Sequence, residues 1–365
     1  IEQAFWIGEL SKKISIEDKR RFSQLFSTGK GRFNLFTLFL EKGHLLLKNA
    51  GLLIYILPEG LFSNPEYKYI RKYITTKTTL LKVTLFSKRV FEAAVNTAVI
   101  LIKNDKINLP AQIYQDLDIL LTELPQSDLQ INPNYIFPVM VNAEKKAIIT
   151  TLNKNASKKF SDFLEVQQGI IYSGKPKKEI FSNTKLSKEY KKVLDGRDIS
   201  KYKINWAVKL ENRYIKYTRD LHRPREERIF IAKEKIVLPR RSMKLVCALD
   251  ENQYYLLNTA YIALSKTSNI DLLYFLGLLN SKLINFYYQS LFFGWQITIP
   301  ALNSLPIAIG SEKQQKKITD IVKLLIKTTS QEDHFRLQTS LDKLIYELYG
   351  LDVNQSLIIE KNSNN

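Results

Sequence analysis

The sequence has very few of the residues that build metal sites and disulfide frameworks. Its 365 residues include three widely separated histidines and a single cysteine, Cys247. A disulfide framework is therefore excluded, and a zinc site is not expected because no metal-ligand spacing exists. Long hydrophobic runs are missing too, since Glu41, Lys42 and Lys48 interrupt the longest one. Nothing is therefore predicted to span a bilayer.

Targeting segments are also missing. No signal peptide is visible, so we expect a cytoplasmic protein with no membrane partner. The chain begins with Ile1 rather than methionine, and residues 1–10 resemble the interior of a domain. We therefore expect that an N-terminal part precedes this chain.

Hydrophobic residues and positive charge are abundant. The hydrophobic fraction is 45%, which predicts a folded globular protein of two or three domains. Lysine and arginine number 55 against 36 acidic residues, a net charge of +19. Such a surplus calls for a polyanionic partner, with nucleic acid the first candidate and an anionic membrane surface the second.

The first hundred residues show the pattern of an α/β unit. Residues 34–48 have the apolar period of a helix, and residues 52–58 form a continuous apolar run typical of a buried parallel strand. A second helix begins at Asn64 and Pro65, and strands are predicted over residues 80–86 and 96–103. This order predicts the second half of a doubly wound sheet that ends in a hairpin.

The rest of the chain changes character twice. Residues 105–159 contain scattered acids and prolines, which we interpret as a linker and the entrance to a new domain. From residue 160, short strands with glycine turns precede long helices. The predicted helices cover residues 271–290, 311–329 and 333–349. The domain prediction is 1–104 for an α/β part, 105–159 for the linker, 160–310 for an α+β domain and 311–365 for helices that brace it.

Several motifs together resemble a known family. The stretches NLFTLFLEKGHLLLKNAGLLIYILPEGLF and KRVFEAAVNTAVILIK resemble the latter part of the catalytic domain of gamma-class, TaqI-type adenine-N6 DNA methyltransferases. The remainder resembles a TaqI-like C-terminal specificity domain. That second resemblance depends on VQQGIIYSG, LDGRDISKY, KIVLPRR, YFLGLLNSKLINFYY, LNSLPI and LDKLIYELYGL. Each motif alone is weak, but their order and spacing along the chain make the resemblance strong.

The resemblance implies a function in a restriction-modification system. It implies site-specific recognition of double-stranded DNA and adenine-N6 methylation with S-adenosylmethionine. The family's glycine-rich cofactor loop and its Asn/Asp-Pro-Pro-aromatic tetrapeptide are not in this chain, so we expect them upstream of Ile1. The strands over residues 52–103 then correspond to the fifth to seventh of the family. A missing N-terminal catalytic portion or a separate catalytic subunit is the expected protein partner, and the isolated chain is expected to be inactive.

Two segments resemble the missing tetrapeptide without its second proline. Asn64 is better explained as the N-cap of a helix, and Asn132 as part of a turn. Glu66-Tyr67-Lys68 and Glu144-Lys145-Lys146 resemble the end of a nuclease motif, but neither has a partner aspartate on an adjoining strand. We therefore expect no nuclease in this chain.

Phe91 is the candidate catalytic-site residue. It follows Val90 between the last two strands, where the family has an aromatic side chain that packs against the flipped target base. An aromatic face recovers part of the stacking that adenine loses when it leaves the duplex. The alternative is a core phenylalanine at the end of a strand. Asn96 and Thr97 belong to the same motif and are expected to be structural.

The positive charge is concentrated in the predicted specificity domain. Residues 171–248 contain 22 Lys and Arg against 9 Asp and Glu, a surplus of +13. Lysines serve phosphates, and arginine forks recognise guanine edges in the major groove. The candidate DNA-binding residues are Lys175, Lys177, Lys178, Arg197, Arg213, Lys216, Arg219, Arg223, Arg225, Arg240, Arg241 and Lys244.

Two uncharged or acidic features have simpler explanations. Asp195 and Asp198 flank a turn, so they either fix its shape or accept hydrogen bonds from cytosine amino groups. Asn280 and Ser281 are predicted to hydrogen-bond a neighbouring loop. The recognised base sequence does not follow from these loops.

Other functions remain open at this stage. The chain could be a DNA-binding specificity module or subunit without catalysis, or the remnant of a decayed gene. A lipid-surface protein is the alternative outside DNA biology, but it would need a basic amphipathic helix. The charge here lies in loops and short strands instead.

Overall fold

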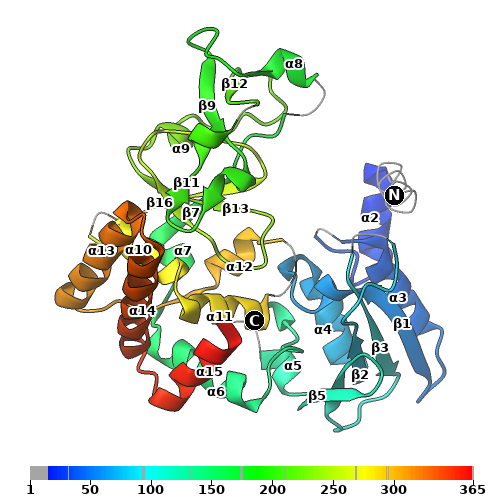
Figure 1. Cartoon of the computed structure of the whole chain (residues 1–365). Coiled ribbons are helices and arrows are strands. Elements are labelled where there is room, and N and C mark those ends of the chain that lie inside the picture. Colours follow the sequence, from blue (N-terminus) through cyan, green and yellow to red (C-terminus); the bar gives the residue numbers. More distant parts are fainter. Residues whose placement is uncertain are drawn as a thin grey trace. The chain divides into compact units, whose positions relative to one another are not determined.

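The computed structural model describes residues 15–31, 33–92, 95–131, 133–172, 176–209, 211–267, 269–292, 294 and 296–363. The chain forms two compact units, residues 1–145 with 290–293, and residues 146–289 with 294–365 (Figure 1). Within the described residues, no helix combines the length and apolar character that crossing a bilayer requires.

The first unit contains a five-stranded mixed sheet. Its strands are β1 (Leu52–Pro58), β2 (Thr79–Leu85), β3 (Thr97–Lys103), β4 (Ala111–Gln115) and β5 (Ile119–Leu124). Their spatial order is β1-β3-β2-β4-β5. The hairpin strand β3 is antiparallel to both β1 and β2, which therefore run parallel to each other. The predicted strands and hairpin are confirmed, but the burial predicted for β1 is wrong. Among the described residues β1 is an edge strand that pairs only with β3, and Leu52, Ile54 and Ile56 are exposed.

Helices cover one face of this sheet. α3 contacts β1 and α4, and α4 contacts β2. Their apolar residues Leu40, Ile70 and Ile74 pack with Ile100 and Ile102 of β3 in one core. The helices of this unit are α2 (Ile16–Leu25), α3 (Leu35–Leu45), α4 (Lys68–Lys77) and α5 (Asp128–Ile131), with 3-10 turns η1 (Glu59–Leu61), η2 (Pro65–Tyr67) and η3 (Pro133–Tyr135).

The linker prediction for residues 105–159 needs a correction. β4 pairs in parallel with β2, and β5 pairs antiparallel with β4, so both belong to the sheet of the first unit. The prolines and acids of this interval suggested irregular structure. However, Ala111 and Ile113 are buried in the core, β4 satisfies backbone groups of β2, and β5 does the same for β4. α6 (Ala143–Asn155) fills much of the remaining interval.

Asn64 has the structural role predicted for it. Its side-chain oxygen accepts a hydrogen bond from Glu66 N at 3.0 Å, so it is an N-cap. Asn132 lies outside the described residues.

The second unit contains two four-stranded sheets and two short ribbons. The strand orders are β14-β13-β16-β7 and β15-β9-β12-β8, and β10 pairs with β11 and β17 with β6. The bounds are β6 (Lys158–Lys159), β7 (Leu164–Gln168), β8 (Phe181–Ser182), β9 (Tyr190–Leu194), β10 (Ile199–Ser200), β11 (Lys203–Ile204), β12 (Tyr214–Lys216), β13 (Lys235–Pro239), β14 (Ala248–Asp250), β15 (Tyr255–Leu256), β16 (Ala260–Ser265) and β17 (Pro306–Ile307).

The helices predicted over residues 311–329 and 333–349 are present as α13 and α14, and α13 packs against α10, which contacts β13 and β14. The helix expected over residues 271–290 is broken into two at Asn280 and Ser281. Gly277 lets α10 approach α13, because a Cβ there would lie 2.9 Å from Val322 Cγ2. The helices and 3-10 turns are α7 (Phe160–Phe163), α8 (Lys177–Ile180), η4 (Gly196–Asp198), η5 (Trp206–Val208), α9 (Arg228–Ile231), α10 (Leu272–Leu279), α11 (Lys282–Leu291), α12 (Ile299–Asn303), α13 (Glu312–Lys327), α14 (Gln331–Leu348) and α15 (Val353–Ser363).

Candidate nucleic-acid interface

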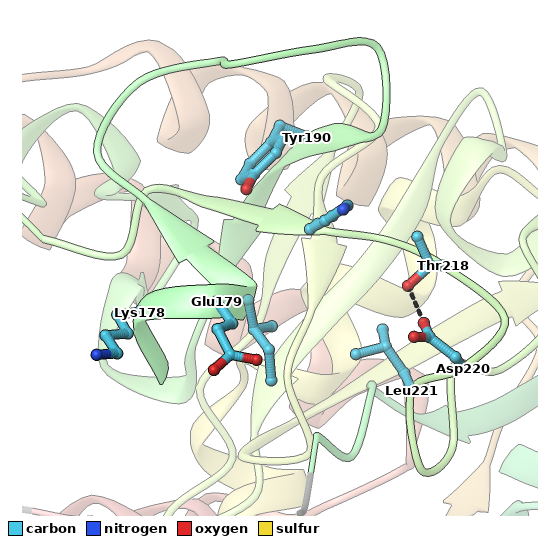
Figure 2. A pocket seen from close by; sticks show the side chains of 8 residues that line it. Lys178, Glu179, Tyr190, Thr218, Asp220 and Leu221 are labelled. Atoms are coloured by element: carbon cyan, nitrogen blue, oxygen red, sulfur yellow. Dashed lines mark hydrogen bonds between the residues drawn. The ribbon is translucent and has the colours of Figure 1, made fainter. Parts of the chain in front are cut away.

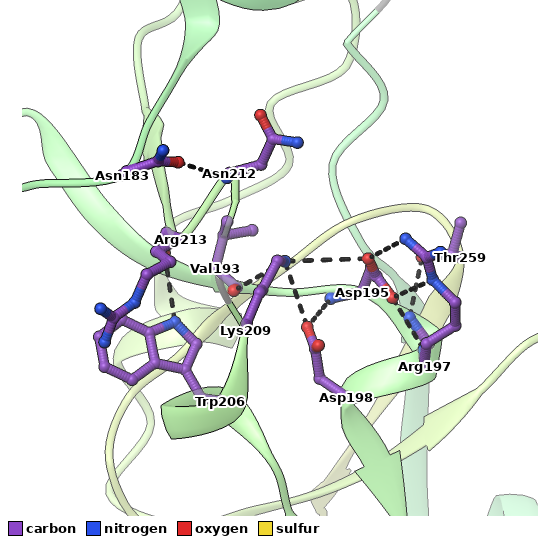
Figure 3. Close-up of polar contacts among 11 residues, drawn as sticks. Asn183, Val193, Asp195, Arg197, Asp198, Trp206, Lys209, Asn212, Arg213 and Thr259 are labelled. Atoms are coloured by element: carbon purple, nitrogen blue, oxygen red, sulfur yellow. Dashed lines mark hydrogen bonds and ion pairs between the residues drawn. The ribbon is translucent and has the colours of Figure 1, made fainter.

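The turn that carries Arg197 is fixed by its own acids. Asp195 Oδ1 accepts from Arg197 N, and Asp198 Oδ2 accepts from Asp195 N, each at 2.8 Å. Lys209 Nζ lies 3.2 Å from Asp198 Oδ2 and 3.8 Å from Asp195 Oδ2 (Figure 3). Although burial raises the pKa of Asp195, hydrogen bonds from Arg197 and the Lys209 charge lower it overall. The shape-fixing interpretation of the two acids is therefore confirmed.

The Arg197 side chain projects from this turn. It is 93% exposed, and its Nη2 lies 3.2 Å from Asp195 Oδ2. The carboxylate therefore orients the guanidinium while most of its donors remain accessible. Such an arginine is suited to a phosphate or a base edge.

Thr259 brings the loops of Arg197 and Arg240 together. Gly196 N donates to Thr259 Oγ1 at 3.0 Å, and Arg240 N donates to Thr259 O at 2.8 Å. A Cβ on Gly196 would lie only 2.6 Å from Thr259 O, so this approach requires glycine. Two cationic segments that are more than forty residues apart in sequence thus meet at one backbone position.

The Arg240 guanidinium is also held in place. In the amide orientation that satisfies the hydrogen-bond network, Gln296 Oε1 accepts from Arg240 Nη2 at 2.7 Å and from Nε at 3.1 Å. Ile297 N donates to Arg240 O at 2.8 Å. Arg241, the next residue, is exposed.

Arg225 joins the same region from a third loop. Its Nε donates to Gly169 O at 3.2 Å, and Gln168 Nε2 donates to Asn258 O at 3.0 Å, next to Thr259. Burial, together with the charge of Arg223, lowers the pKa of Arg225. We call the residues Arg197, Arg225, Arg240 and Arg241 the central arginine cluster.

Arg213 lies in a second, aromatic environment. Its Cζ is 4.3 Å from the centroid of the Trp206 ring, and Lys192 Nζ is 4.6 Å from the same ring. Trp206 Nε1 donates to Arg213 O at 3.2 Å (Figure 3). The indole is buried and holds both cations by cation–π attraction, which fixes their position without neutralising them.

Lys178 and Lys216 line a pocket of about 390 Å³ (Figure 2). Acids and hydroxyls share this pocket, and Lys216 Nζ lies 3.7 Å from Glu189 Oε2. Its local charge is therefore mixed. The lining residues are Lys178, Glu179, Ile180, Tyr190, Lys216, Thr218, Asp220 and Leu221.

The remaining candidates are mostly exposed. Arg223 exchanges backbone hydrogen bonds with Ile171 at 3.0 and 3.1 Å. Lys175 lies outside the described residues. The exposed side chains among the remaining candidates are Lys177, Arg219, Arg223 and Lys244.

Some positive charge that contributes to the surplus is buried or already paired with acids. Lys235 and Asp250 are fully buried, with Nζ 2.6 Å from Oδ2. Arg228 is paired with Glu165 at 3.0 Å and with Glu226 at 2.6 Å. Net charge therefore overstates the accessible cationic surface.

Sequence patterns did not identify the residues that assemble the central arginine cluster. Thr259, Gln168 and Gln296 are uncharged and distant in sequence from the arginines that they hold. Lys209 was counted in the charge but not recognised as the partner of Asp198. The turn chemistry of Asp195 was the one local signal available.

Phe91 lies in the loop between β2 and β3 of the first unit. Its side chain is 45% exposed, and that of Val90 is 46% exposed, so Phe91 is not a core residue. Asn96 O accepts from Glu59 N at 2.9 Å, and Thr97 pairs with Pro58 in the sheet. The structural roles expected for Asn96 and Thr97 are confirmed, whereas base stacking by Phe91 stays a prediction.

Comparisons with known proteins match this two-part organisation. Residues 8–91 match the family of the Eco57I restriction-modification methylase, and residues 191–307 match the TaqI-like C-terminal specificity domain. These two matches confirm the resemblance drawn from the motifs, to a restriction-modification methylase in the first part of the chain and to a TaqI-like specificity domain in the second.

Individual relatives are longer than this chain. A putative type II restriction enzyme and methyltransferase of Methanocaldococcus jannaschii is 25% identical over 358 residues, and the match covers 88% of this chain but 29% of that protein. The fold is similar to that of the Type IIL restriction-modification enzyme MmeI in complex with DNA, with a TM-score of 0.57 and 11% identity, over 90% of this chain and 51% of that one. The fold is also similar to that of the DrdV–DNA complex, with a TM-score of 0.52 and 7% sequence identity. That match covers 86% of this chain and 42% of the other.

Proposed function

We propose that this chain recognises a specific DNA sequence for an adenine-N6 methyltransferase of a restriction-modification system. The observation that carries this proposal is that three arginine loops meet. The loops of Arg197 and Arg240 are joined at Thr259, and Arg225 is linked to Asn258 through Gln168, whose Oε1 accepts from Arg225 Nη2 at 3.4 Å. Oriented guanidinium groups from separate loops fit a duplex, because each can address a different phosphate or base edge. The methylase segment in the same chain supports coupling of recognition to methyl transfer.

The outer edge of β1 supports completion of the sheet by other residues. Leu52, Ile54 and Ile56 are 55%, 69% and 41% exposed, whereas Leu53 and Tyr55 pack on the core. No strand pairs with this edge among the described residues. An exposed apolar edge strand favours association. We assign the missing partner as the preceding part of the catalytic domain or a separate catalytic subunit, with β1, β2 and β3 as the fifth, sixth and seventh strands.

The described loop after β1 does not fit S-adenosylmethionine. The loop after β1 is filled by the buried Arg71 guanidinium, which donates to Leu61 O at 2.6 Å and Asn64 O at 2.7 Å. That loop is not a glycine-rich backbone cradle. The cofactor is therefore assigned to the partner portion, where it would supply the methyl group.

Within such an enzyme the chain would bind, orient and select the substrate. The central arginine cluster would hold the duplex, and the exposed ring of Phe91 would stack on the extruded adenine. Stacking of this kind contributes about 1–3 kcal/mol per base. Catalysis would then depend on positioning rather than on a strong base.

Methylation in cells tests this proposal. The gene for the complete protein would be expressed in a host without adenine methylation, and modified bases would be mapped by sequencing. We expect N6-methyladenine at one short motif. Absence of a motif, despite folded protein and available cofactor, would contradict the proposal.

A specificity subunit without catalysis is the second candidate, and the exposed edge of β1 is compatible with it. Co-expression distinguishes the two. A subunit requires a second gene product before any motif is methylated, whereas a single longer polypeptide does not.

A further inference from the structure

The break between α10 and α11 holds a backbone segment from another part of the chain. Asn280, the last residue before the break, is fully buried. Its Oδ1 accepts from Cys247 N and its Nδ2 donates to Cys247 O, both at 2.9 Å. The predicted contact of Asn280 with a neighbouring loop is thus confirmed, and it is a two-point contact.

Asn285, in α11, repeats this contact two residues earlier along the same segment. Its Oδ1 accepts from Leu245 N at 2.7 Å, and its Nδ2 donates to Leu245 O at 3.3 Å. Two side-chain amides therefore pair with residues 245 and 247 as a neighbouring strand would. Such paired contacts fix both the position and the register of the segment.

This segment leads directly into the cationic loop at residues 240–244. Arg240 anchors the other end of that loop through its contacts with Thr259 and Ile297. Exposed Arg241 and Lys244 lie between the two anchors. The loop is thus held at both ends, and the two asparagines hold the end nearer to Lys244.

The same junction reaches the loop of Arg197. Cys247 O also accepts from Tyr202 N at 2.9 Å, and Tyr202 follows the Arg197 turn in the chain. Tyr202 Oη in turn donates to Gln338 Oε1 at 3.1 Å, on α14. Both arginine loops are therefore tied to the helices at one place.

The start of α11 is itself fixed on α14. Asp342 Oδ1 accepts from Lys282 N at 2.8 Å, and its Oδ2 accepts from Gln338 Nε2 at 3.1 Å. Asn285 is thus mounted on a helix whose first turn is anchored, and Asn280 caps the helix directly before it.

We propose that Asn280 and Asn285 are positioning residues for sequence recognition. They set the register of residues 240–247, and thereby decide which base pair faces Arg240 and Arg241. This inference rests on the proposed function, because the register of residues 240–247 can affect sequence recognition only if this loop contacts DNA.

The test compares the intact protein with Asn285→Asp and Asn285→Ala. Asn285→Asp keeps the acceptor for Leu245 N. In the parent protein, Asn285 Nδ2 donates to the carbonyls of Leu245, Leu279 and Ser281, and the variant would place a second carboxylate oxygen against them instead. Asn285→Ala removes these contacts without repulsion and serves if the aspartate variant does not fold. Each protein would select duplexes from a randomised pool, and amide exchange would be followed at Leu245.

The expected result is position-specific. Both variants should lose about tenfold in base discrimination at the positions that Arg241→Ala also relaxes, and keep discrimination elsewhere. Exchange at Leu245 should accelerate. Asn155→Ala is the matched control, since it removes one amide-to-backbone bond, to Tyr349 O at 2.8 Å, away from both loops.

Two results would overturn the inference. If exchange at Leu245 accelerates while the selected motif is unchanged or uniformly weakened, the asparagines are structural only. If the parent protein selects no motif, the proposed function fails, and the inference fails with it.

Discussion

Along one edge of the first unit the exposed side chains are Leu52, Ile54 and Ile56, whereas around Thr259 in the second unit they are arginines. The apolar edge has no partner strand among the described residues, so its hydrophobic area stays in water. The guanidinium groups, in contrast, are held by a carboxylate, an amide or a carbonyl. An exposed apolar edge and a cluster of anchored arginines thus coexist in one chain.

The two units therefore differ in what each needs in order to fold and bind. The second unit has its own buried polar contacts and should fold and bind without help. Under the proposed function, the first unit instead depends on a partner to cover the apolar edge of its sheet. Each prediction below tests one side of this comparison.

The largest effect is expected from Asp250→Ala in the second unit. It leaves the Lys235 ammonium buried without its carboxylate, so the free energy of unfolding should fall by about 3–5 kcal/mol. Chemical denaturation measures this. The control is Arg228→Ala, which removes exposed ion pairs and should cost less than about 1 kcal/mol. Equal effects would show that the second unit does not depend on its buried pair.

Charge reversal of Arg240 and Arg241 should have the next largest effect. Arg240→Glu with Arg241→Glu should weaken duplex binding and flatten the salt dependence by up to about two units of slope, because each phosphate contact contributes about 0.9. Binding titrations at several salt concentrations measure this. Lys316→Glu with Lys317→Glu on α13 changes the net charge equally. An unchanged slope in the arginine variant would remove these residues from the interface.

Phe91→Ala should affect methylation more than binding. In the complete enzyme the loss of stacking should lower the methylation rate about tenfold, while duplex affinity changes little. Single-turnover methylation and titration of the same protein separate the two quantities. Equal losses in both would argue against base stacking.

The smallest effect on stability is expected from Ile54→Lys at the open edge. The side chain is 69% exposed, so the free energy of unfolding of this chain should change by less than about 0.5 kcal/mol. Association with the catalytic portion, followed by sedimentation, should nevertheless weaken. Ile100→Lys in the buried β3 core would instead unfold the unit. Unimpaired association in Ile54→Lys would show that this edge is not the contact.

Local patterns predicted the parts of the fold that depend on local chemistry. The apolar run of β1, the Asn64 cap and the Asp195 turn are decided by neighbouring residues, so the sequence was sufficient. β4 and β5 were missed because their strands are short and lie among prolines, and they depend on pairing within the sheet, β4 with β2 and β5 with β4. The helix break at Asn280 depends on Cys247, more than thirty residues away.

The candidate site was predictable in composition but not in arrangement. The sequence identified the arginines, yet it could not separate Arg197, which is exposed, from Arg213, which stacks on Trp206. It gave no sign that Lys235 is buried. Such differences follow from tertiary contacts, chiefly those of Thr259, Gln168 and Gln296.

A structure of this protein with a duplex containing its methylated motif tests the central claim most directly. The account predicts that Arg197 and Arg240 donate hydrogen bonds to phosphates or base edges, with residues 240–244 at the DNA. A duplex held elsewhere, with both guanidinium groups in solvent, would contradict it.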